Sequence, residues 1–191
     1  MLDIANILKK EILYNFKFGA VFYRDPIDTK FCTKQDKNDY IDLTDDMKRF
    51  QPFVGGIKAY GGLDEPEDWV GGYDLALHRM TWRNGKKMII HITDSGAHGV
   101  EYSQGDRHPE EGWKLTNLIK ECSIKKIIIV AFKVIAPNKK VSSSLQSFNR
   151  VKYLYEQDGN GENFQSENFD QNRLDPGYFT SKVVDAISMV T

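Results

Sequence analysis

The stretches "KKMIIHITD", residues 86–94, and "KKIIIVAFKV", residues 125–134, decide the fold class of this chain. Each begins with two lysines and continues as a run of apolar side chains, which is typical of a strand buried on both faces. Between them lies "PEEGWKLTNLIKECS", residues 109–123, which has helical periodicity. A strand, a helix and a second strand in this order predict parallel strands, because the helix returns the chain to the start of the sheet.

The alternation of strands and helices extends along the whole chain. We predict further strands at residues 17–25, 40–44 and 163–169, and further helices at residues 2–13, 44–57, 64–80, 142–157 and 176–190. The expected fold is α/β, a mostly parallel, doubly wound sheet with helices on both faces, in a single domain over residues 1–191. We expect Thr44 to cap the helix that follows it, and Asp64 with Glu67 to form a capping box.

Composition excludes several classes of partner. The chain has 191 residues, with 26 basic against 27 acidic side chains and a net charge of −1. It therefore lacks the positive field that drives non-specific binding to nucleic acid or an anionic membrane. Neither Cys32 nor Cys122 belongs to a CxxC pair, and no apolar stretch is long enough to span a bilayer. Since the N-terminus also lacks the pattern of a signal peptide, we expect a cytoplasmic protein.

The motifs of common active sites are missing from the sequence. There is no GxxxxGK[ST] loop, no GxGxxG after a first strand and no GxSxG elbow. Ser95 is the one nucleophile candidate at a strand end, and nothing in the sequence pairs it with a base. We therefore expect no enzymatic activity.

Acidic and hydroxyl side chains follow the predicted strands, where α/β proteins bind their ligands. Asp94, Ser95 and Asp64 could offer oxygen ligands to a hard cation, although on spacing alone we favour simple caps for Asp64 and Asp94. His91 lies inside a strand and is expected in the core. His98 and His108 lie in a loop and are expected to be exposed, so zinc ligation is the less favoured interpretation.

Three stretches carry a resemblance to a known family. They are "FGAVFYRDPID" at residues 18–28, "LTDDMKRFQPFVGGIKAYGGLDEPEDWVGGYDLAL" at residues 43–77 and "KKMIIHITDSGAHG" at residues 86–99. Together they resemble the von Willebrand factor A domains of the intracellular branch attached to alpha-type kinases. The resemblance covers residues 1 to 135, and the last third follows the family in element order.

The resemblance implies a metal-ion-dependent adhesion site at the carboxyl-end rim of the sheet. In the family this site uses D-x-S-x-S after the first strand, a threonine in a later loop and an aspartate after the fourth strand. Asp94 matches the third segment, Leu63 stands in place of the threonine with Asp64 as the remaining oxygen donor, and the first segment is absent. The resemblance thus implies weak binding of Mg²⁺ or Mn²⁺ at Asp94 and Asp64.

The absent segment includes the central strand of the family's sheet, so the sheet is expected to be incomplete at its N-terminal side. A fragment of a larger protein or a gene start placed too late explains this, and we favour these explanations. A strand inserted by a partner is the alternative.

The function implied by the resemblance is protein binding at this rim, with or without a divalent metal, through a carboxylate of the partner. Asp94 would be the anchor, Asp64 and Ser95 would assist, and Gly61 and Gly62 would let the loop turn. Arg24 and Asp25 are expected to form an ion pair or a cap nearby. The alternatives are a metal-free scaffold and a regulatory fragment of an alpha-type kinase or another large enzyme.

Overall fold

The computed structural model describes residues 16–25, 39–58, 64–136, 139–170 and 175–188, and the predicted helix at residues 2–13 and Gly61 and Gly62 lie outside them. The elements in chain order are β1 (Phe18–Phe22), β2 (Asp39–Thr44), α2 (Met47–Gly56), α3 (Trp69–His78), β3 (Met88–Thr93), α4 (Pro109–Ile124), β4 (Ile128–Ile135), α5 (Leu145–Gln157), the short 3₁₀ helix η2 (Gly161–Asn163), β5 (Phe164–Asp170) and α6 (Pro176–Ser188). The predicted strands and helices that fall within the described residues are confirmed.

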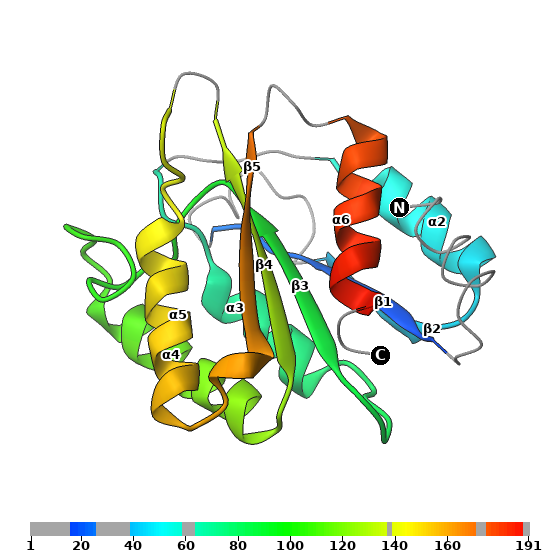
Figure 1. Cartoon of the computed structure of the whole chain (residues 1–191), viewed down its shortest axis with the longest axis horizontal. Helices are drawn as coiled ribbons and strands as arrows, with labels where there is room; N and C mark the ends of the chain where they lie inside the picture. Colours follow the sequence, from blue (N-terminus) through cyan, green and yellow to red (C-terminus); the bar gives the residue numbers. More distant parts are fainter. Residues whose placement is uncertain (1–15, 26–38, 59–63, 137–138, 171–174, 189–191) are drawn as a thin grey trace.

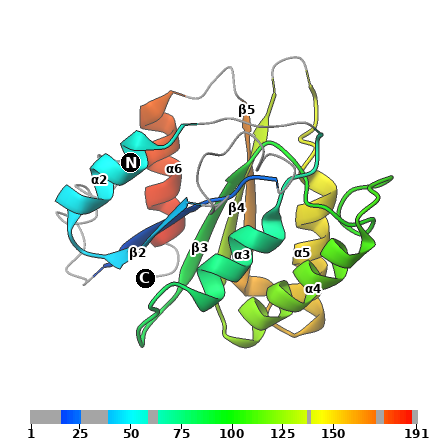
Figure 2. The same cartoon turned by 180° about the vertical axis from the view of Figure 1, so that it is seen from behind.

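Strands β3, β4 and β5 form a parallel sheet in that order, with Ile90 paired to Val130 and Val130 paired to Gln165. Helices cover both of its faces, as Figures 1 and 2 show from opposite sides. Along β4, Ile129 and Ala131 pack with α3, α4 and α5, whereas Val130 and Phe132 pack with α6. The predicted α/β class is confirmed. Strand β4 is apolar on both faces, and helices cover both of these faces.

Strands β1 and β2 form a separate antiparallel pair, with Val21 opposite Tyr40. Within the described residues, no backbone ladder joins β1 to β3. A cavity of about 1150 Å³ lies there, lined by both strands and by side chains of α3 and α6. In the described residues the strands thus form two separate sheets, with the division between β1 and β3.

Both predicted helix caps are wrong. The carboxylate of Asp46 caps α2 by accepting hydrogen bonds from the N–H groups of Lys48 and Arg49, while Thr44 accepts from the N–H of Asp46. Asp68 caps α3, accepting from the N–H of Gly71 at 2.8 Å.

The cap of α3 is displaced because its approach segment is held extended by the loop after β3. Glu67 forms an isolated parallel bridge with Ala97, and its N–H donates to the carbonyl of Gly96 at 2.9 Å. A residue paired in this way cannot occupy the first turn of a helix.

Among the described helices, none is both long and apolar enough to cross a membrane.

Candidate functional site

At one rim of the molecule, side chains that follow β1 contact side chains of β3 and of the loop after it. Tyr23, after β1, shares a hydrogen bond of 2.8 Å with Nε2 of His91 in β3. Asp25 lies two residues further on and contacts His98, in the loop after β3, at 2.7 Å. Both strands therefore deliver their following residues to the same place, where parallel sheets gather functional groups.

His91 is a core residue, as predicted. Its second nitrogen, Nδ1, shares a hydrogen bond of 3.0 Å with Tyr73, and its ring lies 4.3 Å from that of Trp69. Burial lowers the pKa of His91 to about 3. The imidazole is therefore neutral at physiological pH and unsuited to hold a metal, since both nitrogens are already hydrogen-bonded.

His98 is the centre of a buried polar cluster, so the expectation that it is exposed is wrong. Only 6% of the residue is accessible, and its ring lies between two carboxylates. Nε2 is 2.7 Å from Oδ2 of Asp25, and Nδ1 is 3.1 Å from Oδ1 of Asp106. Burial opposes the charged imidazolium, but the hydrogen bonds and charges of the two carboxylates outweigh it and raise the pKa of His98.

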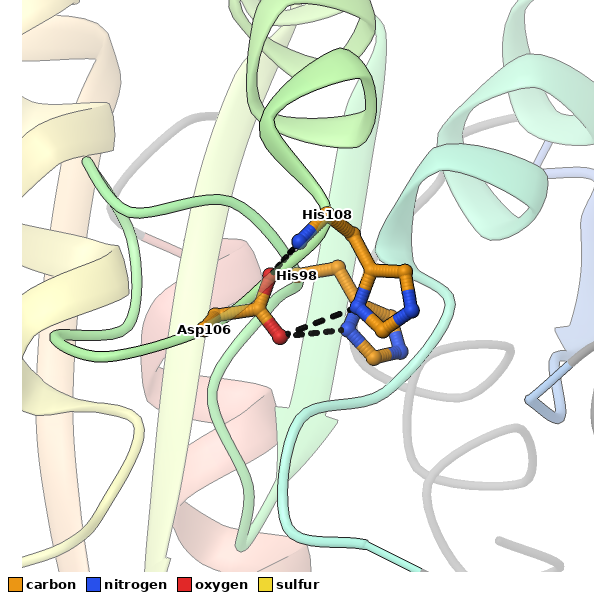
Figure 3. A group of neighbouring side chains, drawn as sticks. All are labelled: His98, Asp106 and His108. Carbon is orange, nitrogen blue, oxygen red and sulfur yellow. Dashed lines mark hydrogen bonds and ion pairs between the residues drawn. The ribbon is translucent and has the colours of Figure 1, made fainter.

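Asp106 is held by the backbone on one side and faces two histidines on the other (Figure 3). Its Oδ2 accepts hydrogen bonds from the N–H groups of Gly99 at 2.7 Å and His108 at 3.0 Å. Its Oδ1 lies 3.1 Å from Nδ1 of His98 and also 3.1 Å from Nδ1 of His108. Although burial acts in the opposite direction, these donors hold the pKa of Asp106 well below its usual range.

The loop reaches this geometry because two glycines pass close to each other. Gly99 has φ +105°, in the region that favours glycine, and a side chain there would collide with the backbone of Gly112 in α4. This approach places the start of α4, and with it His108, against His98; the two imidazole centroids are 4.4 Å apart.

Two groups of side chains in the described part of the chain have ligand atoms close enough to hold a metal ion. They are His98 with Asp106 and His108, and His98 with Asp25 and Asp64; within each group the ligand atoms lie within 4.8 Å of one another. Asp64 itself is exposed, and its pKa is raised by partial burial and by the neighbouring Asp25 carboxylate. The structure therefore brings Asp64 to the cluster.

Asp94 belongs to neither group, and its role as a metal ligand stays a prediction. The residue is exposed at the end of β3, and its carbonyl accepts a hydrogen bond from Ser143 Oγ at 2.5 Å. Ser95 lies beside it, with its N–H donating to Thr93 Oγ1 at 3.2 Å. Arg24 forms an ion pair with Asp39 at 3.0 Å, whereas the carboxylate of Asp25 contacts the imidazole of His98.

Sequence reasoning missed Asp106 and weighed His108 only as an exposed loop residue. The available signal was local: an aspartate two residues before a histidine, just ahead of a helix that begins with proline at residue 109. An aspartate in that position readily accepts hydrogen bonds from the backbone two residues on, as Asp106 does here.

Comparison with known proteins gives one informative match. The chain is 34% identical over 117 residues to a protein named alpha-protein kinase vwkA from Dictyostelium discoideum. The match covers 59% of this chain and 18% of the relative, so the chain spans less than a fifth of that protein. It supports the resemblance to the kinase-associated branch in part, and it does not show this region to be catalytic.

No protein-family profile matches the chain. No solved structure matches it either.

Proposed function

We propose that this chain is a protein-interaction module of the von Willebrand factor A type that binds its partner at the carboxyl-end rim. One observation carries the proposal: Asp94 presents an exposed carboxylate on a backbone that is fixed at the end of β3. The Ser143 hydroxyl holds the Asp94 carbonyl, and the Thr93 hydroxyl holds the following turn. A charged group on a rigid support suits recognition, because little conformational entropy is lost on binding.

The proposed module does not depend on Mg²⁺ or Mn²⁺. These ions need a nearly octahedral set of oxygen ligands, and the described residues place Asp64 with Asp25 and His98 and leave Asp94 outside that group. The described residues do not form the oxygen cage that the family resemblance implies. A scaffold whose rim contact uses no metal, in which Asp94 pairs directly with a basic group of the partner, is the form we favour.

Hydrolytic or thiol chemistry has little support among the residues that the structure describes. Cys122 lies in the core, where burial raises its pKa to about 12, so its thiol is not an activated nucleophile. The backbone N–H of Ser95 bonds to Thr93, and no hydrogen bond in the described residues joins the Ser95 hydroxyl to a histidine. We therefore infer a binding role and not a catalytic one.

Proximity labelling in cells, with a labelling enzyme fused to the chain, tests the proposal. We compare the wild type with Asp94→Lys and with the matched control Asp158→Lys. Asp158 is also exposed but follows α5 at the opposite end of the sheet. Proteins that are labelled by the wild type and the control and lost with Asp94→Lys support a rim interface. Equal labelling by all three contradicts it.

A regulatory part of an alpha-type kinase is the second candidate, supported by the match to 18% of a kinase-named protein. Sequencing the full transcript from its source decides this alternative. An alpha-kinase domain in the same reading frame supports it, and a transcript that encodes no such domain removes it.

A further inference from the structure

We propose that His98, Asp106 and His108 form a binding site for Zn²⁺, separate from the rim contact at Asp94. The three side chains come from the loop after β3 and the segment before α4 (Figure 3). Two imidazole nitrogens and one carboxylate oxygen are a ligand set that zinc commonly uses. The inference goes beyond the proposed function, since it concerns a second site and a different chemistry.

The two histidine nitrogens approach the same carboxylate oxygen, and the three ligand atoms lie within 4.8 Å of one another. Nδ1 of His98 and Nδ1 of His108 each lie 3.1 Å from the same oxygen of Asp106. Zinc–ligand distances near 2.0–2.2 Å in a tetrahedron separate neighbouring ligand atoms by about 3.3–3.6 Å. An outward shift of only a few tenths of an ångström in each contact would therefore admit the ion.

The groups behind the ligands are also in place. The nitrogen of His98 that faces away from the site, Nε2, contacts the Asp25 carboxylate at 2.7 Å. A carboxylate behind a ligating histidine fixes its tautomer and orientation and makes it a better ligand. The second oxygen of Asp106 is held by the N–H groups of Gly99 and His108, which leaves the first oxygen aimed at the histidines.

Charge and access fit a divalent cation. Asp106 and Asp25 carry two negative charges in this cluster, and a Zn²⁺ ion bound by neutral histidines would balance them. The side chains of His98 and Asp106 are 6% and 4% exposed, whereas that of His108 is 48% exposed. The ion would therefore have access from solvent past His108.

His78 provides an internal comparison. It also contacts two carboxylates through opposite nitrogens of its ring, Asp74 at 2.8 Å and Glu121 at 3.1 Å. Unlike Asp106, neither carboxylate is shared with a second histidine, and among the described residues His78 belongs to no group of three metal-ligand side chains. This histidine has an exposure of 43%, close to that of His108, which makes it a matched control.

The test is a titration of the chelator-treated whole chain with Zn²⁺ alone, followed by calorimetry, with metal content after dialysis measured by elemental analysis. We expect one ion per chain. His108→Ala should weaken binding by at least roughly tenfold, and His78→Ala should leave it unchanged. Because His108 is largely exposed, its variant should keep the wild-type circular dichroism, whereas loss of buried His98 could unfold the chain.

Absence of stoichiometric Zn²⁺, or equal affinity in His108→Ala and the wild type, would overturn the inference and leave the cluster as a metal-free ion-pair network. An equal loss in His78→Ala would also overturn it, because surface histidines would then account for binding. Asp94→Lys should bind Zn²⁺ like the wild type. His108→Ala thus tests the zinc site and Asp94→Lys tests the rim interface, so the two failures can be told apart.

Discussion

Asp25 and His98 are 73 positions apart in the sequence, yet Oδ2 of Asp25 lies 2.7 Å from Nε2 of His98. The contact joins the segment after β1 to the loop after β3, two strands that share no backbone ladder in the described structure. Tyr23, two residues before Asp25, makes a second such contact with His91 of β3, at 2.8 Å. Side chains, in place of a continuous sheet, hold the antiparallel pair against the parallel sheet at this rim.

We expect Asp25→Asn to lower the free energy of unfolding by about 1–3 kcal/mol, because it removes a charged acceptor from a buried imidazole. Urea unfolding measures the change. Asp74→Asn is the matched control. Asp74 pairs with His78 on an exposed surface, where loss of an ion pair should cost less than about 1 kcal/mol. Equal effects of the two variants would contradict the structural role of Asp25.

Gly99→Ala should destabilise the chain more than Gly105→Ala. Both glycines have positive φ, +105° and +87°, and an alanine in this region costs roughly 1–2 kcal/mol at either position. Only at Gly99 would the new methyl group also collide with the backbone of Gly112, whereas it would meet open space at Gly105. Thermal unfolding of both variants compares the costs. A similar loss at both sites would show that α4 does not pack as closely as the structure has it.

The strands could be predicted from sequence because their signal is local. The runs at residues 86–94 and 125–134 are both apolar on both faces. The structure buries the strand of the second run between helices, whereas β3, from the first run, is only partly buried and leaves Ile92 exposed. The cap of α3 could not be predicted, because its displacement depends on Glu67 pairing with Ala97, which is distant in the sequence. The same holds for the contact between Asp25 and His98. Nothing near His98 indicates that Asp25 will lie beside it, so its burial followed only from the tertiary structure.

His78 should stabilise the fold at low pH and lose this effect as the pH rises. Hydrogen bonds with Asp74 and then Glu121, against a small burial effect, raise its pKa. The stabilisation is full below the unfolded pKa near 6.5 and disappears as the pH passes the raised folded pKa. The difference in unfolding free energy between the wild type and His78→Gln should thus be larger at about pH 5.5 than at about pH 8.5, and below about 1 kcal/mol because the pair is exposed. A difference that is independent of pH would refute this.

His91 should act in the opposite direction. Burial lowers its folded pKa to about 3, so the folded chain does not take up a proton on this ring when the unfolded chain does. It has no effect on the pH dependence above the unfolded pKa near 6.5, and below it the free energy of unfolding should fall by up to about 1.4 kcal/mol per pH unit.

His91→Phe keeps a ring among the surrounding aromatic side chains but cannot bind a proton. It should be less stable at neutral pH, because the hydroxyl of Tyr73 loses a buried partner. Between about pH 6.5 and pH 5, however, the variant should lose about 1.6 kcal/mol less than the wild type, as measured by urea unfolding at each pH. Parallel pH profiles for the two proteins would mean that His91 is protonated in the folded state, contrary to its burial between Tyr23 and Tyr73.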